Sequence, residues 1–125
     1  DELARRHRMK TGALIAASCL NGYYAAEPEP SDEICRDLRK YAYALGLAFQ
    51  ITDDILDVTS DEQTLGKPIG SDEENGKVTS LTFLSLEEAS NEAERVTEKA
   101  ISAIKKYPSS EALCDLAKYL RSRSF

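Results

Sequence analysis

Residues 43–58, YALGLAFQITDDILDV, are the most informative part of this sequence about its fold. On an α-helix its four polar side chains fall at i, i+3, i+4 and i+7 and project from one stripe. These four are Gln50, Asp53, Asp54 and Asp57. The other positions are apolar nearly all round, and a helix of that kind is normally buried. The stretch therefore predicts a buried helix with three carboxylates on one face.

Three neighbouring carboxylates on a buried helix repel one another and are costly to desolvate unless a cation compensates them. Oxygen ligands without His or Cys suit Mg²⁺, which binds one or two protein carboxylates together with the phosphate oxygens of a substrate. The stripe thus predicts Mg²⁺ and a phosphorylated substrate together. A solvated acidic face is the alternative, but the flanking apolar residues leave little room for one.

The rest of the chain predicts further helices and no strand. Helical patterns cover about 3–26, 31–58, 77–106 and 110–121, and the first weakens in helix preference at Thr11-Gly12. The prolines of EPEPS, residues 27–31, stop the first helix because proline cannot continue it. Residues 59–76 are rich in glycine and polar side chains, which predicts a long loop. We expect an all-α architecture.

Composition limits the class of protein. The 125 residues include 42% hydrophobic side chains, enough for one core, and carry a net charge of -6. This net acidic charge argues against nucleic acid as a partner, because binding to a phosphate backbone needs clustered Lys and Arg. No apolar run approaches the ~20 residues that cross a bilayer, so membrane insertion is not expected.

The cysteines and the N-terminus give two more expectations. Cys19, Cys35 and Cys114 are odd in number and widely spaced, which indicates neither a disulfide framework nor a zinc site and suits a reducing cytoplasm. The chain starts with helix-type composition and without an initiator Met or a clear capping residue. This start predicts a chain cut inside or just before a helix.

Three segments together resemble a known family. FQITDDILD, residues 49–57, is similar to the second aspartate-rich motif of the polyprenyl synthases, which make geranyl, farnesyl and geranylgeranyl diphosphates. MKTGALI, residues 9–15, and LGKPIGSD followed by NGKVT, within residues 65–79, are similar to two further signatures in the family's order. The resemblance covers essentially the whole chain and is closest to bacterial farnesyl diphosphate synthases. It implies the C-terminal half of an isoprenoid-synthase-type helical bundle.

The resemblance also implies a role for each motif residue. Asp53 would bind Mg²⁺ directly, and Asp54 and Asp57 would help through water or by holding its surroundings. Lys10 and Lys67 would contact the diphosphate of the allylic substrate, and Lys77 would flank it. Thr11 and Gln50 would turn oxygen atoms toward the allylic carbocation, so that Lys10, Thr11 and Gln50 form the catalytic set.

Three other basic side chains have open roles. His7 precedes the Lys10-Thr11 segment and can either support the site or pack at the surface. Arg121 and Arg123 stand where some family members place basic residues over a diphosphate, although frayed basic tails are also common.

The chain departs from the family in extent. The family uses two facing aspartate-rich motifs to condense isopentenyl diphosphate with an allylic diphosphate, and only the second occurs here. We expect the chain to be a synthase fragment that is inactive alone, with farnesyl or geranylgeranyl diphosphate as the product of the complete enzyme. The alternative is a non-catalytic small regulatory subunit of a heteromeric synthase. A third hypothesis, a purely helical interaction module, would require the three ordered signatures to be a coincidence. Half a bundle would expose apolar helix faces, which predicts a homodimer or higher oligomer.

Overall fold

A computed structural model describes residues 2–60 and 84–123 of the chain, and within these ranges the regular elements are all helical. The all-α prediction is confirmed. The elements are α1 (Glu2–His7), a π-helical turn η1 (Arg8–Gly12), α2 (Ala13–Ala26), α3 (Asp32–Ser60), α5 (Leu86–Ile104) and α6 (Glu111–Ser122).

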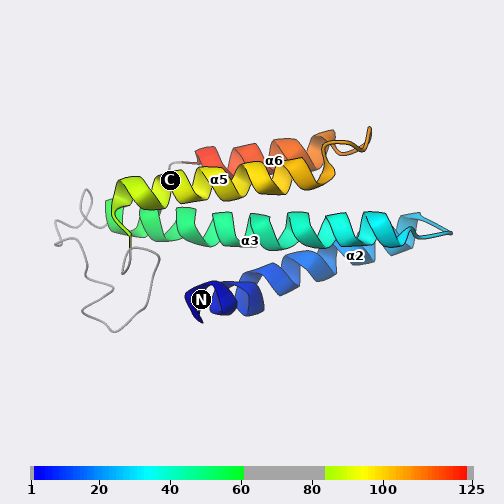
Figure 1. Cartoon of the computed structure of the whole chain (residues 1–125), viewed down its shortest axis with the longest axis horizontal. Coiled ribbons are helices and arrows are strands. Elements are labelled where there is room, and N and C mark those ends of the chain that lie inside the picture. The colour runs from blue at the N-terminus through cyan, green and yellow to red at the C-terminus, as the bar shows by residue number, and fades with distance from the viewer. Residues whose placement is uncertain (1, 61–83, 124–125) are drawn as a thin grey trace.

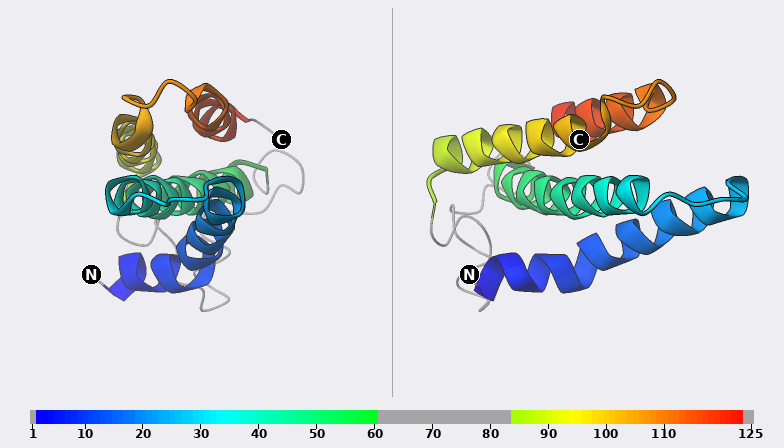
Figure 2. Two further views of the ribbon diagram at one scale, coloured as in Figure 1. Left: turned by 90° about the vertical axis from the view of Figure 1, so that its right-hand side faces the viewer. Right: turned by 45° about the vertical axis from the view of Figure 1, so that its right-hand side comes forward.

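Helix α3 lies in the middle of the molecule (Figure 1). Helices α5 and α6 pack on one side of it, and the α1–η1–α2 segment packs on the other (Figure 2). Alanines on α3 and α5 are buried and let the two helices approach closely: they are Ala44, Ala48, Ala89, Ala93 and Ala100. The stretch that the sequence predicts as buried therefore forms the central element of the described fold.

The main core lies between α3, α5 and α6. Tyr41, Val96 and Ile104 are the largest fully buried side chains, and burying a Val or Ile side chain contributes about 1.5–3 kcal/mol. Tyr41 also donates a 2.8 Å hydrogen bond to the carbonyl of Leu113, which fixes the start of α6 against α3. Burial raises the pKa of the Tyr41 hydroxyl, so it remains a neutral donor.

The observed helix ends agree closely with those expected from the sequence near the prolines, but not before α5. Helix α3 begins at Asp32, one residue after the expected start, and ends at Ser60 rather than 58. The expected helix over 77–106 does not run through residues 84–85, since α5 begins at Leu86, and it ends at Ile104 rather than 106; its expected start over 77–83 lies outside the described residues. Ser85 accepts a hydrogen bond from the Glu88 backbone and the Glu88 side chain returns one to the Ser85 backbone, a capping box that fixes the start of α5. Residues 61–83, with most of the expected loop, lie outside the described residues.

A polar cluster ties the turn after α5 to the N-terminal part of α3. Tyr107 donates a 2.5 Å hydrogen bond to Oδ2 of Asp37, and the Lys106 ammonium lies 3.1 Å from the same oxygen. Lys106 also pairs with Glu33 at 3.0 Å. The Tyr107 hydrogen bond, followed by the one from Lys106, lowers the pKa of Asp37 below its ordinary value.

This cluster predicts a pH-dependent stability. A carboxyl whose pKa is lower in the folded state stabilises the fold above its unfolded pKa of about 3.9, and the effect is lost as pH falls through the folded pKa. We expect Asp37→Asn to lower the Tm at pH 7 and to flatten its decline below pH 4. Circular dichroism melts measure this, with the exposed Asp115→Asn as the control. Parallel Tm–pH curves for Asp37→Asn and the wild type would contradict the assignment.

Two further observations concern the environment of the chain. Cys19, Cys35 and Cys114 are free thiols, and burial raises the pKa of Cys19. In the part of the chain that the structure describes, no helix is long and apolar enough to cross a membrane.

Candidate functional site

The site begins where η1 lies against α3 without intervening side chains. A Cβ atom on Gly46 would stand 2.8 Å from the Cα of Gly12, and one on Gly12 would stand 2.7 Å from Cδ1 of Tyr43. At Gly46 only glycine allows the two backbones to come this close, whereas a Cβ on Gly12 would press on the Tyr43 ring. The weak helix preference at Thr11-Gly12 thus corresponds to a π-helical turn, a feature often found at functional sites.

This close contact brings two sequence-predicted residues together. Thr11 Oγ1 donates a hydrogen bond of 3.3 Å to Oε1 of Gln50 on α3. Lys10, the neighbour of Thr11 on η1, has an exposed side chain. The MKTGALI and FQITDDILD segments, far apart in sequence, therefore share one place in the fold.

The three aspartates differ in exposure although they stand close together on α3. Asp54 is buried, the Asp53 side chain is 43% exposed and Asp57 is exposed. Asp53 is thus reachable by a ligand while its helix remains packed. Among the described residues, no group of three or more His, Cys, Asp or Glu side chains is arranged to hold a metal ion. The described residues by themselves therefore provide at most part of a coordination shell.

Arg123 approaches the same aspartate from the end of α6. Its side chain is only 7% exposed, and Nη2 lies 3.5 Å from Oδ1 of Asp53. The guanidinium lies 4.3 Å from the centre of the Phe49 ring and donates a 3.4 Å hydrogen bond to the Phe49 carbonyl. A basic residue near the C-terminus reads in sequence as a frayed tail, so the buried position of Arg123 is a structural finding.

Arg123 supplies a compensating charge near the aspartates that the sequence alone assigned to a metal. Asp53 already has a guanidinium beside it. Arg121 takes another direction: it donates a 2.8 Å hydrogen bond to Oγ of Ser90 and pairs with Glu94 at 2.9 Å on α5. Of the two C-terminal arginines, only Arg123 contacts the aspartate stripe in the described contacts.

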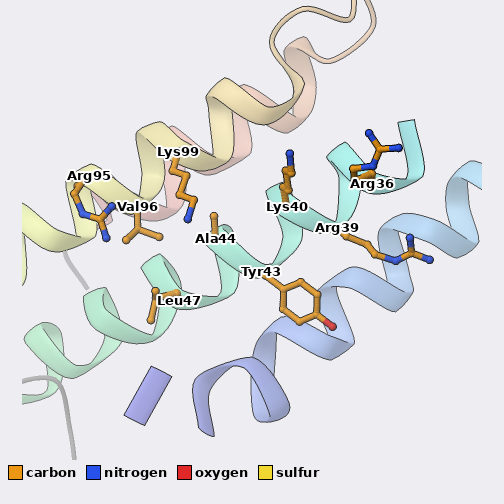
Figure 3. Close-up of a pocket in the computed structure, with 9 residues that line it drawn as sticks. All are labelled: Arg36, Arg39, Lys40, Tyr43, Ala44, Leu47, Arg95, Val96 and Lys99. Carbon is orange, nitrogen blue, oxygen red and sulfur yellow. The ribbon is translucent and has the colours of Figure 1, made fainter. Parts of the chain in front are cut away.

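A cationic groove lies further along α3, against α5 (Figure 3). It has a volume of about 430 Å³, and Tyr43, Ala44, Leu47 and Val96 form its apolar lining. Its cations come from both helices: they are Arg36, Arg39, Lys40, Arg95 and Lys99. None of the aspartates lines it, so the groove is separate from the Asp53 site. The groove has no signature in the sequence because its residues are dispersed over two helices.

Several predicted residues cannot be placed. Lys67 and Lys77 lie outside the described residues, and so does any contact they make with Lys10 or Asp53. His7 ends α1, but the structure does not describe its side chain. The assignments of Lys67, Lys77 and His7 therefore stay predictions.

The helical architecture and the meeting of the two signature segments define the class of protein. The sequence matches the polyprenyl synthetase family over residues 1–119, and the chain belongs to this family. It is 41% identical over 128 residues to the farnesyl diphosphate synthase of Escherichia coli, covering 99% of this chain and 42% of that protein. It is 35% identical over 123 residues to the farnesyl diphosphate synthase of Haemophilus influenzae, covering 98% and 42%.

A solved structure gives the same relation in three dimensions. The geranyltransferase of Legionella pneumophila superimposes with a TM-score of 0.74 at 31% identity, covering 98% of this chain and 37% of that one. The chain therefore spans about two fifths of the length of the relatives that it matches.

Proposed function

We propose that this chain is the C-terminal part of a prenyltransferase that condenses isopentenyl diphosphate with an allylic diphosphate. One observation carries the proposal. The Gly12–Gly46 contact and the Thr11–Gln50 hydrogen bond hold the MKTGALI segment against the helix that carries the aspartate-rich motif. Both segments thus face one place, as a shared substrate requires. Farnesyl or geranylgeranyl diphosphate is the proposed product, in accord with the names of the relatives.

The donor set fits Mg²⁺ as one side of a site. Asp53 offers a partly exposed carboxylate and Asp57 an exposed one, with no nitrogen or sulfur donor among the predicted ligands. Mg²⁺ accepts one or two protein carboxylates and completes its shell with water and phosphate oxygens. We propose that Asp53 binds the ion and that Asp54 and Asp57 support it. When bound, the ion would neutralise charge on the diphosphate leaving group.

Ionisation of the allylic diphosphate separates a negative diphosphate from a positive allylic cation. The remaining residues would stabilise these two charges. Lys10, Lys67 and Lys77 would hold the negative diphosphate oxygens by charge-assisted hydrogen bonds. The Thr11 hydroxyl and the Gln50 carbonyl would present oxygen dipoles to the allylic cation. Their mutual hydrogen bond of 3.3 Å fixes both side chains before substrate binds. Preorganised dipoles of this kind stabilise developing charge without reorganisation during the reaction.

A second candidate rests on one specific relative. The chain is 54% identical over 76 residues to component 2 of the heptaprenyl diphosphate synthase of Geobacillus stearothermophilus, a synthase named as having more than one component. The second candidate is therefore a subunit of a heteromeric synthase. The proposed small regulatory subunit would be non-catalytic, and it would adjust a partner's product without using Asp53.

Complementation of activity tests the proposal. We expect no prenyl transfer from the 125 residues alone, because a single aspartate-rich motif cannot complete the metal cluster around a diphosphate. The complete synthase is defined as this chain preceded by an N-terminal part with the first aspartate-rich motif. It should be active when Mg²⁺ is supplied. Its proposed location is the cytoplasm. Radiolabelled isopentenyl diphosphate and geranyl diphosphate provide the assay. Robust product from the 125 residues alone would contradict the fragment hypothesis.

The same preparations test the proposed oligomer. Helix α2 carries exposed apolar side chains, with Leu14 70% and Tyr24 48% exposed. Exposed apolar patches tend to become contact surfaces. We expect self-association in sedimentation velocity, and a strictly monomeric species across the micromolar range would contradict it.

A further inference from the structure

Arg123 lies at the C-terminal end of α6, beside the proposed metal site. The guanidinium bridges two residues that are one turn apart on α3: it contacts the Phe49 carbonyl at 3.4 Å and Asp53 Oδ1 at 3.5 Å. The Phe49 ring lies under it at 4.3 Å. With a side chain only 7% exposed, Arg123 is largely withdrawn from water.

The fold holds the arginine in this position. Arg121 fastens the end of α6 to Ser90 and Glu94 of α5, so the backbone has little freedom two residues later. Arg123 itself leaves the helix with extended geometry, φ -62° and ψ 148°, and its side chain reaches α3. Arginine does not lose its proton in proteins, so this charge is permanent.

The two contacts to Arg123 Nη2 are long for charge-assisted hydrogen bonds, which are usually about 2.7–2.9 Å. The interaction with Asp53 is therefore mainly Coulombic. The Asp53 side chain is still 43% exposed, so another cation can approach its carboxylate. A divalent ion at Asp53 would stand within a few ångströms of a permanent positive charge. The two cations would repel each other while sharing one carboxylate.

We propose that Arg123 is the resident counterion of Asp53 and that it weakens the binding of a divalent ion to the site until a diphosphate arrives. This inference rests on the proposed function, because it takes Asp53 as the metal ligand. In the absence of diphosphate, the ion gains Asp53 but is opposed by the guanidinium. The negative oxygens of a diphosphate offset that repulsion, so metal and diphosphate bind together in preference to metal alone.

Binding of Mn²⁺, followed by electron paramagnetic resonance of the free ion, tests the proposal in the complete synthase. For Arg123→Gln we expect Mn²⁺ without diphosphate to bind roughly three- to tenfold more tightly than to the wild type. This is the effect on affinity expected from removing one nearby positive charge in a partly aqueous site. Arg123→Lys keeps the charge and should stay within about twofold of the wild type. With saturating inorganic pyrophosphate, the difference in Mn²⁺ affinity between Arg123→Gln and the wild type should become smaller.

Matched variants separate this effect from structural damage. Lys118→Gln removes an exposed cation from the same helix without a contact to Asp53 or Arg123 among the described contacts, and its Mn²⁺ affinity should equal that of the wild type. Arg123→Met keeps apolar contact with Phe49 and should reproduce Arg123→Gln, so it replaces that variant if Gln impairs folding. Unchanged or weaker Mn²⁺ binding in the folded uncharged variant would overturn the counterion role.

Asp53→Asn distinguishes failure of this inference from failure of the proposed function. If Asp53→Asn loses Mn²⁺ binding while the uncharged Arg123 variants bind like the wild type, only the counterion role fails. If Asp53→Asn binds Mn²⁺ as the wild type does, the metal assignment itself fails, and the counterion role fails with it.

Discussion

Replacing Asp53 with alanine in the complete synthase should lower kcat by about 10²–10³-fold, the loss typical when one group that stabilises transition-state charge is removed. The interaction of Asp53 with the metal becomes more important as negative charge develops on the departing pyrophosphate. The loss should therefore fall on kcat more than on KM. Steady-state condensation of isopentenyl and geranyl diphosphates over a range of Mg²⁺ concentrations measures both quantities.

Two variants show whether this loss comes from charge or from packing. Asp53→Asn keeps the size of the side chain and an oxygen beside Arg123, and it should lose nearly as much activity as Asp53→Ala. Asp115→Ala removes an exposed carboxylate on α6 and should leave kcat unchanged. Near-normal turnover of a folded Asp53→Ala enzyme would refute the metal assignment. Turnover retained in Asp53→Asn alone would show that shape rather than charge matters.

Gly46→Ala should be the most damaging small substitution in the described helices. The new Cβ would lie 2.8 Å from the Cα and 3.0 Å from the nitrogen of Gly12, and backbone atoms cannot rotate away as a flexible side chain can. Overpacking of this kind costs about 1–3 kcal/mol. It should also push η1 away from α3 and lengthen the 3.3 Å contact between Thr11 and Gln50. We expect both a lower Tm and a lower kcat in the complete synthase.

Gly22→Ala is the matched control for Gly46→Ala. Gly22 lies in α2 and has no atom within 4 Å of a built Cβ, so alanine fits without displacement. Alanine is favoured over glycine in a helix by roughly 0.5–1 kcal/mol. Gly22→Ala should therefore raise the Tm while Gly46→Ala lowers it. Equal Tm values for Gly46→Ala and the wild type would show that η1 adapts to the added methyl group at little cost.

Features that depend on neighbouring residues follow from the amino-acid sequence alone. The apolar character of residues 43–58 predicted a buried helix, and α3 is the central helix of the described fold. The EPEPS segment predicted the break between the first two helices, because proline excludes helical geometry locally. The start of α5 was missed, although the Ser85–Glu88 capping box was visible in the sequence and the residues before it, KVTSLTFL (77–84), are mostly weak helix formers.

Packing between the helices sets which distant residues meet. Thr11 and Gln50 are 39 positions apart, and Arg123 and Asp53 are 70 apart, so no local period relates them. The contact of Gly12 with Gly46 sets the first pair, and the anchoring of α6 on α5 sets the second. Helical periodicity reports which face of a helix is apolar, but the partner of that face depends on packing between helices. For this reason the sequence predicted the aspartate stripe, whereas the arginine beside Asp53 emerged only from the fold.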